Sequence, residues 1–117
     1  MPTTRNAKQA SDSTLSTVTA RPVEKAIHVI GGKWKLLLLR SLLLNGPQGY
    51  NQLLSTVAGI SPKELTRNLR ELASSALITR APGASMRTSQ YALTPLGNGL
   101  MPTFQCLLTW GQNLLQK

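Results

Sequence analysis

Three cations recur at helical spacing in the middle of the chain. Lys63, Arg67 and Arg70 are separated by four and three residues, and Ser74 follows four residues later. In a helix these residues share one face, with Thr66 at its margin and no carboxylate among them. Because arginine can bridge O6 and N7 of guanine or hold a phosphate, such a face would suit a DNA groove. The alternative is a solvated helix face whose positive sign has no function.

A helix start signal precedes these cations. Ser61 is a good N-cap, Pro62 fits the first helical position, and Glu64 completes a capping box three residues after Ser61. The residues from 61 to about 75 are therefore predicted to form one helix.

The opposite side of this helix is apolar. We expect it to be buried, since its members follow a helical period: Leu65, Leu69, Leu72 and Ala76. Glu71 lies four residues after Arg67, a spacing at which the two side chains can pair.

Composition narrows the classes of function. The chain has 117 residues, which is typical of one domain, and its 13 Lys and Arg against four Asp and Glu give a net charge of +9. This charge favours an anionic partner such as nucleic acid over a role in solubility alone. The longest apolar run, at 36–44, is too short to span a membrane, so no membrane partner and a cytoplasmic location are expected.

Enzymatic chemistry is not expected. With one His and four carboxylates, neither a catalytic triad nor a metal-bound water is readily assembled, and no cofactor or metal is predicted. Cys106 is the only cysteine, which excludes an intramolecular disulfide and a cysteine-based zinc site. Its expected role is that of a small hydrophobic residue, and a redox role is the alternative.

Before the basic helix the pattern predicts three others. Residues 22–30 carry an apolar stripe that includes Val23 and Ile27, and 33–44 are apolar nearly all round, which predicts a mostly enclosed helix. Residues 50–57 then form a short helix that a tight Gly-containing turn joins to the basic one. Two helices so joined form a helix-turn-helix. Residues 1–20, rich in Ser and Thr, are predicted to be a disordered tail, and 21–117 the folded domain.

A β-hairpin is predicted after the basic helix. Residues 77–80 and 88–93 alternate as strands around a Pro-Gly turn, so the fold class is mainly α with a small β-hairpin (α+β), a winged helix-turn-helix. The wing covers about 80–89. Arg80 and Arg87 flank its tip, which would lie near the DNA backbone or minor groove.

The last helix is predicted in two parts. Thr94 and Pro95 cap its start, and Pro102 interrupts it. Beyond this break an apolar face follows helical spacing: Leu100, Phe104, Leu107, Leu108, Gly111 and Leu114. We expect this face to form a homodimer interface. The alternative is packing over the core of its own chain.

Several blocks of this sequence resemble HxlR-type transcriptional regulators, relatives of the MarR group. The similarity runs from residue 21 to about 115, and the blocks that carry it are Pro22-Val23-Glu24, Ile30-Gly31-Gly32-Lys33-Trp34-Lys35-Leu36-Leu37, the segment Gly59–Leu72 with its Ile-Ser-Pro-Lys-Glu-Leu-Thr, Tyr91-Ala92-Leu93-Thr94-Pro95-Leu96-Gly97, and Trp110. The resemblance implies a bacterial or archaeal homodimer that binds operator DNA, with its first and last helices forming the dimer layer. On this chain it therefore adds Val23 and Ile27 of the first helix to the expected interface.

Carried onto this chain, the resemblance implies a set of DNA-contacting residues: Ser61, Lys63, Thr66, Arg67 and Arg70 in the helix, and Arg87 in the wing. One departure is informative. Family members often have a cysteine before Pro-Val-Glu, whereas Arg21 stands there in this chain, which excludes thiol sensing at that position.

The sequence thus predicts a sequence-specific transcriptional regulator, with repression the favoured mode, that binds a palindromic operator as a homodimer. Two alternatives stay open: a winged-helix module for protein interaction, and a non-specific nucleic-acid binder. The sequence leaves open the operator, the target genes, and whether a small-molecule effector binds.

Overall fold

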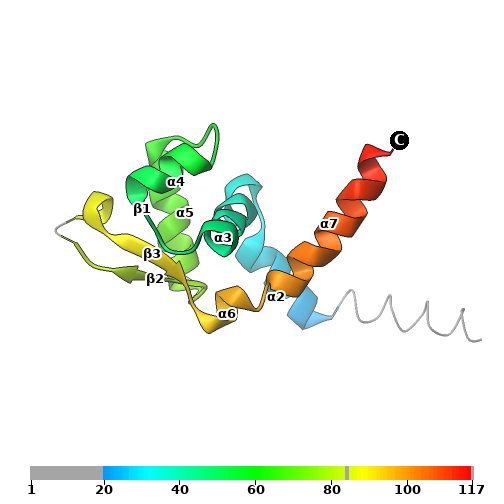
Figure 1. Ribbon diagram of the computed structural model, residues 1–117. Coiled ribbons are helices and arrows are strands. Elements are labelled where there is room, and N and C mark those ends of the chain that lie inside the picture. Colours follow the sequence, from blue (N-terminus) through cyan, green and yellow to red (C-terminus); the bar gives the residue numbers. More distant parts are fainter. Residues whose placement is uncertain (1–19, 84, 117) are drawn as a thin grey trace, which may run out of the picture. The chain divides into compact units, whose positions relative to one another are not determined.

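The computed structural model describes residues 20–83 and 85–116, and these divide into two units that meet at Gly31 and Gly32 (Figure 1). The described part of the first unit is one helix, α2 (Arg21–Ile30), none of whose residues is buried. The predicted tail at 1–20 lies outside the described residues except for Ala20. Among the described residues, none of the helices has the length and apolar character needed to cross a bilayer.

The second unit contains a helix-turn-helix followed by a hairpin. Its elements are α3 (Lys33–Asn45), β1 (Gln48–Gly49), α4 (Tyr50–Thr56), α5 (Pro62–Ser74), β2 (Ile78–Ala81), the 3₁₀ turn η1 (Met86–Thr88), β3 (Gln90–Leu93), α6 (Pro95–Asn98) and α7 (Met101–Leu115). This arrangement confirms the predicted winged helix-turn-helix of mainly α class. In Figure 1 the β2–β3 hairpin and α7 lie at opposite ends of the unit.

The sheet has one more strand than predicted. Its antiparallel order is β1-β3-β2, with Gln48 opposite Tyr91 and Arg80 opposite Tyr91 on the other side. The sequence did not predict β1, because a strand of two residues is too short to show an alternating polar and apolar pattern. Gln48 is only 3% exposed, and its amide donates to the Ser41 hydroxyl at 2.9 Å and accepts from the Thr56 hydroxyl at 3.1 Å. This polar cluster ties β1 to α3 and α4.

Leucines and two tyrosines form the core. The fully enclosed large hydrophobic side chains come from α3, α4, α5 and β3: Leu38, Leu39, Leu53, Leu65, Leu69, Leu72, Tyr50 and Tyr91. The prediction that the second helix is mostly enclosed was wrong at its end, because Leu44 is 72% exposed. The stripe predicted on the basic helix also ends early. α5 stops at Ser74, and Ala76 is exposed with φ 62°, so it belongs to the turn into β2.

The predicted two-part C-terminal helix is confirmed. Thr94 caps α6 by accepting from the Gly97 N–H, and α7 begins at Met101 with Pro102 in its first turn. Gly97 is required by close packing, since a Cβ there would lie 2.2 Å from the Leu77 carbonyl oxygen. The break therefore directs α7 away from the β2–β3 hairpin.

Candidate nucleic-acid interface

The start of α5 is held by the predicted capping box. The Ser61 hydroxyl accepts from the Glu64 N–H at 3.1 Å, and Glu64 Oε1 accepts from the Ser61 N–H at 3.2 Å and from its hydroxyl at 3.0 Å. These bonds to Ser61, together with one from Trp34, lower the pKa of the Glu64 carboxyl. The Ser61 hydroxyl is therefore already engaged inside the domain, although the sequence predicted that it contacts DNA.

The two sides of α5 differ sharply in exposure. Leu65 and Leu69 are both 0% exposed, whereas Lys63, Arg67 and Arg70 are exposed. Within the described residues, none of these three cations forms a salt bridge. The structure therefore presents the predicted cationic face to solvent, with its charge available to a ligand.

The ion pair that helical spacing allows between Glu71 and Arg67 is not formed. Glu71 Oε1 instead accepts from Lys35 Nζ of α3 at 2.6 Å. The Lys35 ammonium, as hydrogen-bond donor and as charge, lowers the pKa of Glu71, and Arg67 adds a smaller effect of the same sign. In the folded chain Lys35 of α3 lies closer to Glu71 than Arg67 does, although Arg67 is only one helical turn away. Helical spacing alone does not reveal such a tertiary contact.

Tyr50 links α4 to the margin of the cationic face. Its hydroxyl donates to the Pro62 carbonyl at 2.9 Å and shares a 2.9 Å hydrogen bond with the Thr66 hydroxyl. Thr66 is thus half-buried and bonded within the domain, so a DNA contact from it would involve its methyl group or require this bond to change. Helical periodicity in the sequence gives no sign of these bonds.

The wing brings one further cation to the same tyrosine. The Arg87 guanidinium of η1 lies 5.2 Å from the centre of the Tyr50 ring and is exposed to solvent. Ser89 organises the described part of the tip, since its hydroxyl donates to the Ser85 carbonyl at 2.9 Å and accepts from the Gly83 N–H. Arg87 is therefore held near α5 through Tyr50, whereas Arg80 lies on β2, opposite Tyr91 of β3.

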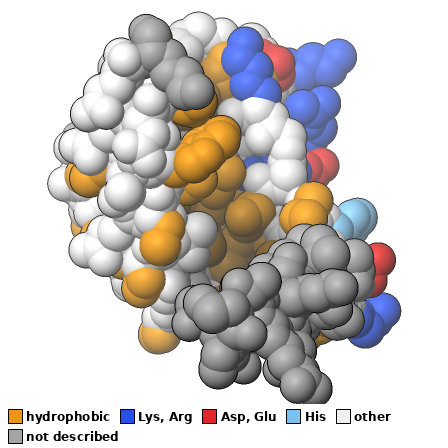
Figure 2. Space-filling model, turned by 90° about the vertical axis from the view of Figure 1, so that its right-hand side faces the viewer, with side chains coloured by type: hydrophobic (Ala, Val, Ile, Leu, Met, Phe, Trp, Pro, Cys, Tyr) orange, Lys and Arg blue, Asp and Glu red, His pale blue; other side chains and the backbone are white. Residues whose placement is uncertain are grey.

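The apolar face of the last helix is uncovered. No residue of α7 is buried, and Leu107, Leu108 and Leu114 are between 41% and 62% exposed. Figure 2, seen from the side of α7, shows hydrophobic side chains exposed over this face. The other predicted interface positions on this segment, Leu100, Phe104 and Gly111, are half-exposed, and Cys106 is exposed. In α2, Val23 is half-exposed and Ile27 is 63% exposed.

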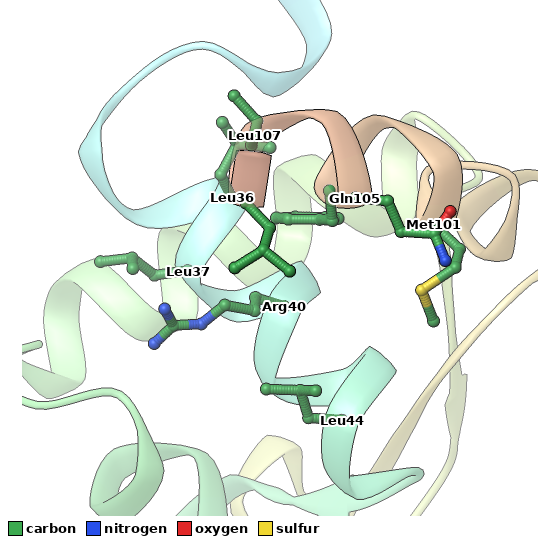
Figure 3. Close-up of a pocket in the computed structure, with 9 residues that line it drawn as sticks. Leu36, Leu37, Arg40, Leu44, Met101, Gln105 and Leu107 are labelled. Atoms are coloured by element: carbon green, nitrogen blue, oxygen red, sulfur yellow. The ribbon is translucent and has the colours of Figure 1, made fainter. Parts of the chain in front are cut away.

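An apolar groove of about 440 Å³ separates α7 from α3. Figure 3 shows side chains entering it from both helices, with Arg40 on the α3 side. Its lining consists of Leu36, Leu37, Arg40, Leu44, Met101, Phe104, Gln105, Leu107 and Leu108. The described residues contain no cluster of His, Cys, Asp or Glu that could hold a metal ion.

Comparison with known proteins agrees with this geometry. The HxlR-like helix-turn-helix family matches residues 29–117. An uncharacterized HTH-type transcriptional regulator of Methanothermobacter thermautotrophicus is 39% identical over 92 residues, which cover 77% of this chain and 69% of the relative.

Solved structures show the same fold. A candidate HTH-type transcriptional regulator called ytcD superimposes with a TM-score of 0.74 at 32% identity, over 81% of this chain and 97% of the other. A candidate MarR-family regulator from Porphyromonas gingivalis gives a TM-score of 0.71 at 28% identity, over 80% and 92%. The chain belongs to the HxlR-like helix-turn-helix family, and it is a transcriptional regulator with a winged-helix DNA-binding fold rather than an enzyme.

Proposed function

We propose that this regulator recognises a specific operator by placing α5 in the DNA major groove. The observation that supports the proposal most strongly is the exposure of Lys63, Arg67 and Arg70 on a helix whose opposite side is fully buried. The buried leucines fix the helix on the domain, and the cations project from it toward solvent. Arg87, held over Tyr50, would contact the backbone or minor groove beside it.

The proposal includes a homodimer built on α7. A helix with no buried residue and several exposed leucines gains stability when another apolar surface covers it. A two-fold symmetric pair would present two α5 helices to major grooves about 34 Å apart, so the operator would be a palindrome with half-sites one turn apart. Val23 and Ile27 of α2 stay predicted members of this interface.

We further propose that binding represses transcription. A dimer that covers two successive turns of a promoter excludes other proteins from it. We propose that the regulator acts in the cytoplasm, where a bacterial or archaeal chromosome lies. The apolar groove between α3 and α7 would accept an apolar effector or, in the dimer, side chains of the second copy.

The substitution Arg67→Ala tests the assignment of α5. Binding of the wild type and the variant is measured by fluorescence anisotropy on a duplex selected by the wild type and on a random duplex. Loss of a guanine contact should weaken binding to the selected duplex by about tenfold and to random DNA by much less. Lys25→Ala is a charge-matched control, since Lys25 is exposed on α2 and is not among the proposed DNA-contacting or interface residues.

Other outcomes would favour the alternatives. An equal loss on both duplexes would make Arg67 a phosphate contact, and equal wild-type affinity for all sequences would indicate a non-specific binder. A protein that ignores DNA at low salt would favour an interaction module. If α5 does meet phosphates, affinity should fall steeply as salt rises.

A further inference from the structure

Two adjacent residues of α3 hold both carboxylates of α5. Trp34 Nε1 donates to Glu64 Oε2 at 2.8 Å, and Lys35 Nζ donates to Glu71 Oε1 at 2.6 Å. Glu64 and Glu71 are seven residues apart, which is about two helical turns. The hydrogen bonds from Trp34 and Lys35 therefore hold α5 near its start and near its end. They are the only acidic residues of α5.

We propose that Trp34 and Lys35 are positioning residues for DNA recognition: they fix the recognition helix α5 and keep its two carboxylates engaged away from the cations that meet DNA. This inference rests on the proposed function and extends it to residues that do not themselves contact the operator.

Trp34 anchors the beginning of α5 in two ways. Its side chain is 8% exposed, and a Cβ placed on Gly59 would lie 3.7 Å from the far edge of its ring. Gly59 has φ +87° and forms the turn between α4 and α5, so the ring packs against the bend of the helix-turn-helix. The indole N–H takes the Glu64 oxygen that the capping box leaves free. One side chain thereby fixes both the turn and the helix cap.

Lys35 acts at the other end by occupying Glu71. Its side chain is only 15% exposed, so it is poorly placed to reach a phosphate itself. Arg67 lies one turn before Glu71 and already interacts with its charge. Without Lys35, Glu71 would pair with Arg67, its nearest cationic partner on the same helix. This ion pair would neutralise the charge of Arg67, which we propose contacts the bases. Lys35 thus keeps Arg67 available by satisfying Glu71.

A double-mutant cycle separates this role from a direct contact. Operator affinity is compared for the wild type, Lys35→Met, Glu71→Gln and the double variant. Lys35→Met should weaken operator binding about tenfold while Glu71 is present, and by less than about twofold in the Glu71→Gln background. Lys33→Met is the control for charge, because it removes the same charge from the same turn and Lys33 has no carboxylate partner among the described residues. The Lys33 ammonium lies 4.6 Å from the centre of the Trp34 ring, so the variant also removes this contact, but its effect should be equal in both Glu71 backgrounds.

An equal loss from Lys35→Met in both backgrounds would overturn the proposal, because that is what a phosphate contact or a simple net-charge effect produces. A second measurement does not need DNA. The pKa of Glu71 is followed by NMR with and without Arg67→Ala, in the wild type and in Lys35→Met. We expect Arg67→Ala to raise the Glu71 pKa more strongly when Lys35 is absent, and equal shifts would contradict the inference.

Trp34→Phe tests the other contact. It keeps the ring packing but removes the N–H, so the pKa of Glu64 should rise and operator affinity should fall severalfold at a temperature where the variant is fully folded. Unchanged operator affinity would overturn the role of Trp34. A wild type that binds no DNA at all would refute the proposed function, whereas the Glu71 titration would still decide whether Lys35 shields Arg67.

Discussion

Helices α5 and α7 are of similar length, 13 and 15 residues, yet they relate to the rest of their unit in opposite ways. In α5 the apolar side chains Leu65, Leu69 and Leu72 are completely enclosed. In α7 no residue is buried, and Leu108 and Trp110 are each 62% exposed. The apolar side of α5 is therefore covered by the rest of its unit, whereas the apolar side of α7 is left exposed by the described residues.

The difference shows that the two uncovered surfaces suit different partners. The free side of α5 is cationic, and a polyanion can complement it. By contrast, α7 carries no charged residue between Met101 and Leu115, and an apolar surface complements its exposed leucines and Trp110. Changes to the buried side of α5 should therefore alter folding, and changes to α7 should alter association.

The largest effect is expected from the buried side of α5. Leu69→Ala creates a cavity at a fully enclosed site, which should lower the free energy of unfolding by about 2–5 kcal/mol. Leu108→Ala on α7 should cost less than about 1 kcal/mol in a dilute sample of monomers, because the side chain is mostly solvated. Urea denaturation measures both. Equal losses would contradict the contrast between the two helices.

A charge on α7 should act on association instead. Leu108→Glu would place a carboxylate in the proposed apolar interface and should weaken dimerisation by about 2 kcal/mol or more. Size exclusion with light scattering gives the mass against concentration. Thr109→Glu adds the same charge to an exposed polar site on the other side of α7 and is the control. A wild type that stays monomeric at high concentration would remove the proposed role of α7.

A smaller effect is expected at the start of α5. Ser61→Ala removes the cap acceptor for the Glu64 N–H and should cost about 1 kcal/mol of stability, whereas Ser61→Thr, which keeps a hydroxyl, should retain most of it. Thermal unfolding measures the difference. If Ser61→Ala were as stable as the wild type, the cap would not be what fixes the first turn of α5.

The smallest effect is a dependence of stability on pH. Hydrogen bonds hold the pKa of Glu64 and Glu71 below the ordinary value of 4.5. The contribution of these two carboxylates to stability is complete above pH 4.5, their pKa in the unfolded state. It is lost as the pH falls through their lower pKa values in the folded state. Unfolding measured between pH 6 and pH 3 should therefore show a shallower loss of stability for Glu64→Gln than for the wild type. An identical slope would contradict this effect.

Local signals in the sequence predicted much of this structure. The Ser61–Glu64 capping box, the leucine period of α5 and the break before Pro102 all depend on residues close in the chain, and all three are confirmed. The exposure of Lys63, Arg67 and Arg70 followed from the same period.

Contacts between distant residues could not be predicted in this way. The bonds from Trp34 to Glu64 and from Lys35 to Glu71 join α3 to α5 across 30 and 36 residues. Helical spacing indicated Arg67 as a partner for Glu71 because it supplies only local partners. Strand β1 escaped prediction because its two residues are held by the buried amide of Gln48 rather than by a pattern.

Selection of bound sequences from a random duplex pool tests the central claim most directly, because it examines whether the exposed side of α5 reads bases. The account predicts enrichment of a palindrome whose half-sites lie one helical turn apart, and loss of that enrichment in Arg67→Ala. A wild-type pool that remains random after several rounds, at a salt concentration where the protein still binds DNA, would contradict it.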